Sequence, residues 1–174
     1  MFLETERLIL RKFRDDDFDD FCDFAMDDEM SRMMGRSRLR TRADARLTFM
    51  WLKNREARGY ALELKSTGRV IGSLTVTHVP RFKEVVRSLE SHQGRSLSFS
   101  ISRHYRRQGL MEEAVRAVID ALFAEGMEYI QCGSFDFNSA SRNLQKKLGF
   151  EYLTTEYIEM DGSVCTAIER ILWK

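Results

Sequence analysis

The stretch from Ser96 to Gly126 carries a strand pattern into a helix pattern through one short cationic turn. In Ser96–Ser102 apolar residues alternate with serines, which is typical of a strand with one buried face. In Met111–Phe123 apolar residues recur every three or four positions, as in an amphipathic helix, and Gly126 marks its end. A strand followed at once by such a helix needs a sheet for the helix to cover, so the stretch predicts a mixed α/β fold.

Further strands and helices fit around this stretch. The expected strands are Arg7–Phe13, Tyr60–Lys65, Val70–Val79, Tyr129–Phe137, Tyr152–Met160 and Ser163–Trp173, with a hairpin turn at Thr67-Gly68. Helices are expected over Asp15–Ala25 and from a capping pair at Thr41 and Asp44 to Gly59. A further helix is expected from Asn138, which can cap it, to Gly149, with Leu144 and Leu148 facing inward. Pro80–Arg95 stays undecided between a long hairpin connection and a short helix. The order of elements predicts one sheet, antiparallel in its hairpins and parallel where a helix crosses over.

Length and composition limit the class of protein. A chain of 174 residues fits a single domain, residues 1–174, and its 43% hydrophobic and 32% charged residues are typical of a packed protein. The formal net charge of +1 gives no global attraction to nucleic acid or to an anionic membrane, so partners must be recognised locally. The cysteines Cys22, Cys132 and Cys165 are odd in number and far apart, which favours reduced thiols in a cytoplasm over disulfides or a metal site.

Two segments bear on targeting and partners. The N-terminal "MFLETERLILRKF" has charges every few residues, so it is neither a secretory signal nor a membrane span, and no later stretch is long and apolar enough to cross a bilayer. The strongly basic segment runs from Arg32 to Arg46. We favour a solvated loop that neutralises the preceding aspartates, with binding to RNA or to a ribosome surface as the alternative. We therefore expect neither a membrane nor a nucleic acid as partner.

The turn before the amphipathic helix has the chemistry of a phosphate site. Backbone N–H groups at the start of a helix lack intrahelical partners and favour an anion, and Arg106 and Arg107 add positive charge. The turn contains neither GxxxxGK[ST] nor GxGxxG, so it is neither a P-loop nor a dinucleotide fingerprint. From the residues alone, a pyrophosphate-bearing cofactor and a plain helix start with solvated arginines both stay open.

The stretch "YRRQGLMEEAV" resembles the acyl-CoA-binding motif of the GCN5-related N-acetyltransferase (GNAT) family, Q/R-x-x-G-x-G/A followed by a helix. Arg106 takes the first position of the motif, Gly109 the glycine and Met111 the final small position. "TERLILR", "VIGSLTV" and "NSASRNLQKKLGFE" are similar to further signatures of the family's ribosomal-protein alanine N-acetyltransferase (RimJ/RimL-type) branch. These four stretches occur in order along nearly the whole chain, which makes the resemblance specific.

The resemblance implies a GNAT-like mixed, mostly antiparallel, splayed central sheet flanked by helices. Acetyl-CoA, with no metal, would lie between the diverging strands Ser96–Ser102 and Tyr129–Phe135. The backbone of Phe99–Ile101 would hold the pantetheine arm like an added strand, Arg106–Glu112 would cradle the pyrophosphate, and Asn138 would face the pantetheine. The implied cofactor contacts are therefore Phe99, Ser100, Ile101, Arg106, Arg107, Gln108, Gly109, Leu110, Met111, Glu112, Asn138 and Ser141.

The chain departs from the family pattern in the pyrophosphate loop and at the expected acid. Arg107 stands where a further glycine is usual, so its backbone must accommodate a Cβ. Gln145 stands where many members carry the tyrosine that protonates the departing thiolate, and an amide cannot replace that acid. Ser141 is then the best candidate to donate to the leaving sulfur. Its alternative role is a hydroxyl bonded to the backbone at the helix start.

The expected base is also missing. Ser96 aligns near the position where this branch often carries a strand glutamate, and a serine would only hold a water there. Glu90 and His92, just upstream, are the remaining candidates for the base, with a solvent-facing position as the alternative for each.

The implied reaction is direct attack of a neutral primary amine on the thioester, with the oxyanion held by a backbone N–H near Phe99–Ile101. At about pH 7.5, deprotonating a lysine amine with a pKa of about 10.4 costs roughly 4 kcal/mol of free energy, whereas deprotonating an α-amine costs less than about 1 kcal/mol. Because the chain offers only weak candidates for the general base, we predict as acceptor the N-terminal α-amine of a protein or peptide, or a small amine of similar basicity. The alternative is a non-catalytic acyl-CoA-binding sensor or partner-binding module, and a homodimer stays open.

Overall fold

The computed structural model describes residues 2–54, 58–78, 89, 91–160 and 162–174. The chain divides into two compact units, Met1–Val76 with Phe99–Val118 and Thr77–Ser98 with Ile119–Lys174, and each unit is described by itself. The division passes through β4 (Arg69–His78), β5 (Gly94–Ile101) and α4 (Leu110–Ala124). Most of the undecided segment Pro80–Arg95 lies outside the described residues, and the single domain stays a prediction.

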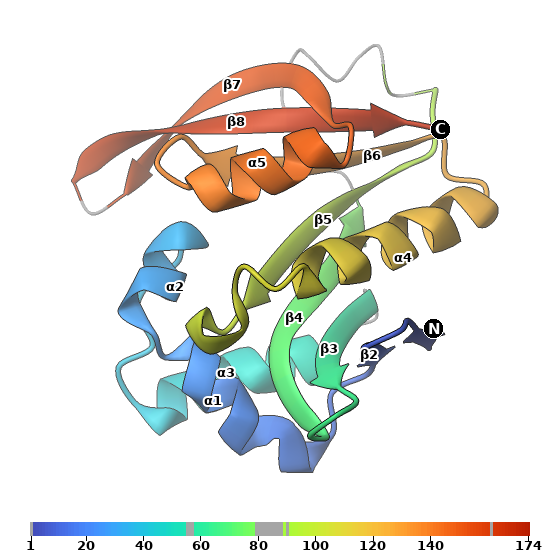
Figure 1. Ribbon diagram of the computed structural model, residues 1–174. Coiled ribbons are helices and arrows are strands. Elements are labelled where there is room, and N and C mark those ends of the chain that lie inside the picture. Colours follow the sequence, from blue (N-terminus) through green and yellow to red (C-terminus); the bar gives the residue numbers. More distant parts are fainter. Residues whose placement is uncertain (1, 55–57, 79–88, 90, 161) are drawn as a thin grey trace. The chain divides into compact units, whose positions relative to one another are not determined.

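The first unit is built on β1 to β4 and the second half of β5 (Figure 1). Strand β2 pairs antiparallel with β1 and with β3, and β3 and β4 form the hairpin predicted around Thr67-Gly68. The remaining elements of this unit are β1 (Leu3–Glu4), β2 (Leu8–Arg11), a 3-10 turn at Asp15–Asp17, α1 (Phe18–Ala25), α2 (Asp28–Met33), α3 (Arg42–Lys53), β3 (Arg58–Leu64) and the first half of α4.

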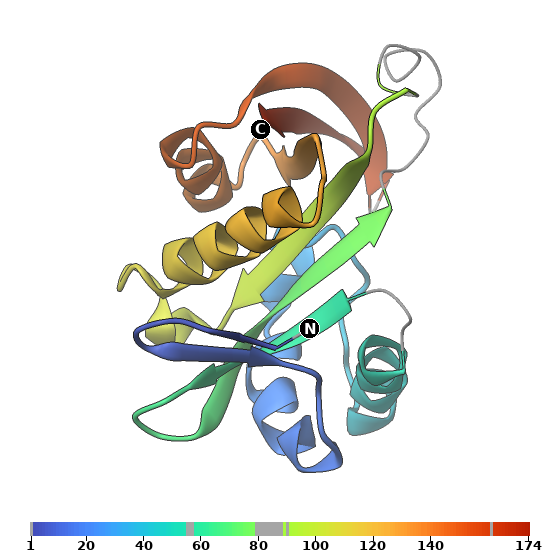
Figure 2. The ribbon, with the colours of Figure 1, turned by 90° about the vertical axis from the view of Figure 1, so that its right-hand side faces the viewer.

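An aromatic cluster forms much of the core of the first unit. Phe18 and Phe21 of α1 and Phe49 of α3 are buried, together with Phe13 just after β2. Their ring centroids lie 5.3–6.1 Å apart, mostly edge to face, an arrangement that adds to the gain from burial. Figure 2 shows α1 and α3 on the same side of the strands. The amphipathic pattern of both helices is therefore explained by one shared core.

The second unit contains the first half of β5, β6 (Tyr129–Phe135), α5 (Ser139–Lys147), β7 (Glu151–Met160), β8 (Ser163–Trp173) and the second half of α4. Strand β6 is parallel to β5 over Gly94–Leu97 and antiparallel to β8, which pairs in turn with β7. Helix α5 lies along β6 (Figure 1). With β5 shared by both units, the strand order is β1-β2-β3-β4-β5-β6-β8-β7, the mixed and mostly antiparallel sheet that the sequence predicts.

The parallel pairing of β5 with β6 is short. It runs from Gly94 with Tyr129 to Leu97 with Cys132, whereas β5 continues to Ile101 and β6 to Phe135. The family resemblance implies that the two strands diverge, and a pairing limited to the first part of each strand is consistent with this expectation.

Several element boundaries differ from the predicted ones. Part of the expected basic loop belongs to α2, because the Asp27 carboxylate caps that helix by accepting from Met30 N at 3.0 Å. Helix α3 begins at the predicted capping box of Thr41 and Asp44 but already ends at Lys53. Gly59, expected to end that helix, lies in β3 opposite Thr75.

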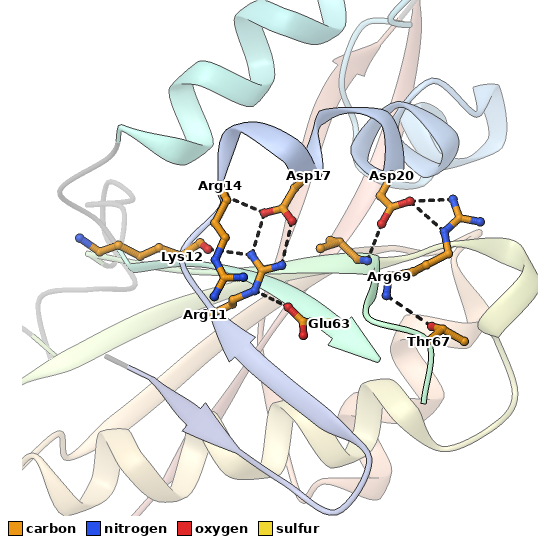
Figure 3. Close-up of polar contacts among 9 residues, drawn as sticks. Arg11, Lys12, Arg14, Asp17, Asp20, Glu63, Thr67 and Arg69 are labelled. Atoms are coloured by element: carbon orange, nitrogen blue, oxygen red, sulfur yellow. Dashed lines mark hydrogen bonds and ion pairs between the residues drawn. The ribbon is translucent and has the colours of Figure 1, made fainter. Parts of the chain in front are cut away.

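A buried charge network ties α1 to the strands of the first unit (Figure 3). Both Nη atoms of Arg11 on β2 donate to Asp17, at 2.7 and 2.8 Å, and its Nε donates to Glu63 on β3. Arg11 and Asp17 are only 6% and 5% exposed. The hydrogen bond to Asp17 raises the pKa of Arg11 above its usual value, against the opposing effect of burial, and Glu63 adds to the increase. The run of aspartates after β2 thus contains Asp17, the buried ion-pair partner of Arg11, as well as acidic residues at the start of a helix.

A second carboxylate of the same block also contacts the strands. Asp20 on α1 accepts from Arg69 Nε at 2.8 Å and from the backbone N–H of Val70 at 2.8 Å (Figure 3). Asp23 accepts from the same guanidinium at 2.6 Å. Helix α1 is therefore fixed to β4 at the start of that strand.

Replacing Asp17 by alanine is expected to lower the free energy of unfolding by about 3–5 kcal/mol, because Arg11 then stays buried without its bidentate partner. Urea unfolding followed by tryptophan fluorescence measures the change. The matched control is Asp19→Ala two residues later, in the first turn of α1, where the exposed pair with Arg42 contributes little and the midpoint is expected to stay nearly unchanged. Equal losses in the two variants would contradict the importance of the buried pair.

Candidate active site

The end of β5 is fixed to β4 within the first unit. The hydroxyls of Ser100 and Ser73 are hydrogen-bonded at 2.9 Å, and Ser102 N donates to Ile71 O at 2.8 Å. Ser100 is buried, whereas Phe99 and Ile101 are half-buried. The three residues predicted to hold the pantetheine arm therefore lie on a strand segment that its neighbour positions.

The turn between β5 and α4 contains two residues in the left-handed region. After a 3-10 turn at Arg103–Tyr105, φ is 61° at Arg107 and 77° at Gly109, and α4 begins at Leu110. Arg107 is the only residue other than glycine with positive φ in the described part of the chain. This conformation explains why the family motif has a glycine there. It also places the first residues of α4, Leu110, Met111 and Glu112, directly after the turn, and the first N–H groups of an α-helix in general have no intrahelical acceptor.

The two arginines of the motif differ in their surroundings. Arg106 Nη1 lies 2.9 Å from Glu29 Oε2 on α2, and nearby Arg103 lies 3.6 Å from Asp27. Arg107 is exposed and has no ion pair among the residues that the structure describes. An exposed ion pair is weak in water, so a phosphate can compete with Glu29 for Arg106, whereas Arg107 needs no exchange of partners.

The N-terminal "TER" segment anchors this turn. Glu113 of α4 accepts from Thr5 Oγ1 at 2.5 Å, from Arg7 N at 2.8 Å and from Arg7 Nε at 2.7 Å. Arg7 Nη1 also donates to Gln108 O at 2.9 Å, inside the turn itself. Burial alone would raise the pKa of Glu113, but the hydrogen bonds from Thr5 and Arg7 together hold it below its usual value. One carboxylate therefore connects the β1–β2 turn with the start of α4.

Sequence reasoning missed this anchor. "TERLILR" was used only as a family signature, and nothing in its pattern of alternating residues points to Glu113, which is more than a hundred positions away. The sequence signal that could have indicated the contact is that "TERLILR" contains Arg7 and "YRRQGLMEEAV" contains Glu113, the two members of the ion pair.

In the second unit, the start of α5 holds the proposed acid. Asn138 caps the helix as predicted, since its Oδ1 accepts from Ser141 N at 3.1 Å. Gln145 Nε2 donates to Ser141 Oγ at 3.1 Å and to Gly133 O at 3.3 Å. Because the Ser141 oxygen accepts from Gln145, its own hydrogen stays available for another acceptor. The sequence predicts that Leu144 faces inward at this part of the helix, whereas the fully buried side chain here is that of Gln145.

The three predicted candidates for the base lie in different surroundings. Ser96 on β5 is half-buried and lies opposite Gln131 in the β5–β6 register. His92 Nδ1 lies 3.0 Å from Glu128 Oε1, and its ring meets Trp173 edge to face at 5.2 Å. Glu90 lies outside the described residues. His92 therefore already has two neighbours that account for its position.

Among the described residues there is neither a cluster of metal ligands nor a membrane-spanning helix. They contain no group of three or more His, Cys, Asp or Glu placed to hold a metal ion. None of their helices is both long and apolar enough to cross a membrane.

Replacing Gly109 by alanine is expected to lower the free energy of unfolding by about 1–2 kcal/mol, because the left-handed region costs an L-residue about that much. Arg107→Gly relieves strain of the same kind, so it is expected to leave the free energy unchanged or to raise it by up to about 1 kcal/mol. Urea unfolding measures both. Arg107→Ala is the matched control, since it removes the charge but keeps the Cβ, and a destabilised Arg107→Gly would show that φ at this position carries no strain.

The anchor predicts a pH dependence. The pKa of Glu113 is lower in the folded than in the unfolded state. The ionised carboxylate therefore stabilises the fold at pH values above the unfolded-state pKa of about 4.3, and this contribution is lost as the pH falls through the folded-state pKa. Glu113→Gln is expected to be less stable than the parent protein at neutral pH, by about 1–2 kcal/mol. The two unfolding midpoints are expected to converge as the pH falls through the lowered folded-state pKa of Glu113. A difference that stays constant with pH would contradict the ionised anchor.

Comparisons with known proteins identify the family and the fold of the chain. The family model described as acetyltransferase (GNAT) domain matches residues 7–151. The chain is 26% identical over 168 residues to the uncharacterized N-acetyltransferase YoaA of Bacillus subtilis (strain 168), covering 92% of this chain and 90% of that protein. The GNAT-family acetyltransferase structure from Bacillus anthracis superposes with a TM-score of 0.84 at 19% identity, covering 99% of this chain and 98% of that one. The ribosomal-protein-S5-alanine acetyltransferase from Vibrio fischeri gives a TM-score of 0.74 at 17% identity over 99% and 96%. Since the family model spans most of its length, the chain belongs to the GNAT acetyltransferase family.

Proposed function

We propose that this protein transfers the acetyl group of acetyl-CoA to a primary amine by direct attack of the amine on the thioester. The observation that carries the proposal is the turn before α4, where two left-handed residues and the anchored Gln108 carbonyl precede the N-terminal end of the helix, which favours an anion. Such a turn suits the pyrophosphate of coenzyme A. Arg106 and Arg107 would supply its positive charge, and Gln108, Gly109, Leu110, Met111 and Glu112 its backbone contacts.

The remaining cofactor contacts follow from the family resemblance. The backbone of Phe99, Ser100 and Ile101 would bind the pantetheine arm and orient the thioester, and one of these N–H groups would hold the oxyanion. Asn138 would contact the pantetheine from the start of α5. The buried hydrogen bond of Ser100 supports this role, because it fixes the strand before the ligand binds.

In the proposed reaction the amine nitrogen bonds to the thioester carbon and the carbon–sulfur bond breaks. One proton lost by the nitrogen ends on the sulfur. Ser141 is the proposed donor of that proton, supported by the Gln145 hydrogen bond that leaves its hydrogen available. Gln145 then positions Ser141 and does not itself act as an acid.

We propose an N-terminal α-amine, or a small amine of similar basicity, as the acceptor. The chain has no tyrosine at the usual acid position and no glutamate at the usual base position, which favours an amine with a pKa close to neutral pH, because its proton is removed at little cost. The similarity to a ribosomal-protein-S5-alanine acetyltransferase supports the same direction, because alanine has no side-chain amine and offers only its α-amine for acetylation. The RimJ/RimL-type assignment is part of this proposal.

We also propose a cellular location, on the basis of the cysteine side chains. Cys22, Cys132 and Cys165 are all free, and burial raises the pKa of both Cys22 and Cys132, so neither forms a thiolate readily. Free, unreactive thiols fit a cytoplasmic location.

The function is tested by acetyl-CoA binding and by thiol release. Acetyl-CoA is expected to raise the unfolding temperature of the purified protein. With acetyl-CoA present, lysine-free peptides with a free N-terminus are expected to release thiol faster than N-terminally blocked peptides that contain lysine. Ser141→Ala is expected to lower kcat by about tenfold or more, whereas Ser139→Ala on the exposed side of the same helix start serves as control.

Three outcomes separate the alternatives. Faster turnover of the blocked peptides would overturn the α-amine acceptor. Binding of acetyl-CoA without thiol release over a broad panel of amines would favour the non-catalytic sensor. A Ser141→Ala variant as active as the Ser139→Ala control would remove Ser141 from the reaction.

A further inference from the structure

A carboxylate lies over the backbone of β6 in the second unit. Glu169 on β8 is the antiparallel partner of Gly133, and a Cβ built at Gly133 would lie 2.0 Å from Glu169 Oε1. Any other residue at position 133 would therefore displace the carboxylate. Gln131, two residues earlier on the same face of β6, donates from Nε2 to Glu169 Oε2 at 3.1 Å.

Gln131 points to a missing hydrogen-bond donor. Its side chain is only 1% exposed, and its Oε1 is buried with no hydrogen-bond partner among the described residues. A buried acceptor without a donor costs about 1–3 kcal/mol, so such an atom in a folded protein is a sign of a ligand or an ordered water. Oε1 belongs to the same amide whose Nε2 donates to Glu169, so the unpartnered oxygen and the carboxylate lie on neighbouring side chains.

Among the described residues, Glu169 has no positively charged side chain as an ion-pair partner. In the described part of the chain no lysine, arginine or histidine forms an ion pair with it. Its charged neighbour is Glu156 on β7, which shares its face of the sheet, while Cys132 on β6 projects from the opposite face. Burial raises the pKa of Glu169, the Gln131 hydrogen bond opposes this, and the negative charge of Glu156 adds to the increase.

The same place is linked to the proposed acid within the second unit. Gly133 faces Glu169, and its carbonyl oxygen accepts from Gln145, whose Nε2 also donates to Ser141. Ser96, which replaces the glutamate usual on that strand, lies directly opposite Gln131 in the β5–β6 register. The carboxylate expected on β5 is thus absent, and another reaches the same sheet face from β8.

We propose that Glu169 and Gln131 bind the ammonium group of the acceptor and that Glu169 takes a proton from it, as the general base of the reaction. This inference rests on the proposed function. An ammonium group is a threefold donor, so it satisfies the Gln131 oxygen and the carboxylate together. The nitrogen loses two protons in the whole reaction, of which one passes to Glu169 and then to solvent, and the other ends on the departing sulfur.

Binding of an amine is tested without turnover, by carbon-13 NMR of the glutamate side-chain carboxyl groups, with alaninamide as the probe. The Glu169 resonance is assigned by its loss in Glu169→Gln. It is expected to titrate above the ordinary glutamate range and to shift when alaninamide is added near pH 7. Gln131→Met is expected to weaken this binding at least about fivefold, the effect of losing one hydrogen bond. Glu156→Gln is the matched control and is expected to retain binding.

A Glu169 resonance that does not respond to alaninamide, or an equal response of the other resonances in Glu169→Gln, would overturn the site. In the transfer assay, Glu169→Gln is expected to lower kcat/KM about 10²–10⁴-fold while acetyl-CoA still raises its unfolding temperature, which also shows that the variant is folded. Glu169→Asp is expected to recover part of the rate.

Failure of this inference differs from failure of the proposed function. Normal transfer by Glu169→Gln removes Glu169 as the base and leaves the acetyltransferase activity in place. An amine response at Glu169 in a protein that consumes no acetyl-CoA with any amine leaves the amine site in place and removes the proposed function.

Discussion

The hydrogen bonds that Glu113 accepts from Thr5 and Arg7 are the constraint on which the proposed cofactor site depends. A turn with left-handed residues at Arg107 and Gly109 is costly by itself, because such a backbone loses the conformations that most residues prefer. It persists only where its ends are held. Glu113 holds the helix side, and Arg7 reaches past it to the Gln108 carbonyl inside the turn. The strain at Arg107 is thus compensated by charge-assisted hydrogen bonds from the other end of the chain.

The same reasoning explains why the N-terminal strand is so strongly fixed. Arg7 can position the turn only if β2 has a single register, and Arg11, four residues later, is buried between Asp17 and Glu63. A shift of β2 by one residue would turn Arg11 to the other face of the sheet and leave both carboxylates without a partner. The buried network therefore selects one register, which in turn places Arg7 beside the turn.

The sequence predicted the parts of the fold that depend on local pattern. Hydrophobic periodicity and turn residues located the β3–β4 hairpin, the caps at Thr41 and Asn138 and the C-terminal hairpin. It did not predict the partners of charged side chains, because these depend on register between distant segments. Arg106 was assigned to phosphate from its place in the motif, and nothing in the pattern showed that Glu29 of α2 would lie beside it. Glu169 was overlooked for the same reason, since its neighbours Gln131 and Gly133 come from another strand.

The two departures from the family pattern in the second unit have a common feature. At each, a buried glutamine uses its Nε2 to hold a neighbouring oxygen, Gln145 with Ser141 and Gln131 with Glu169, and at each the Oε1 has no partner in the described part of the chain. A buried amide is too weak an acid or base to replace tyrosine or glutamate, but it orients a weaker group well, because both its donor and its acceptor have fixed directions. In the proposed reaction the chain would therefore not lack an acid and a base. Each role would be distributed over two residues, one that exchanges the proton and one that fixes its position.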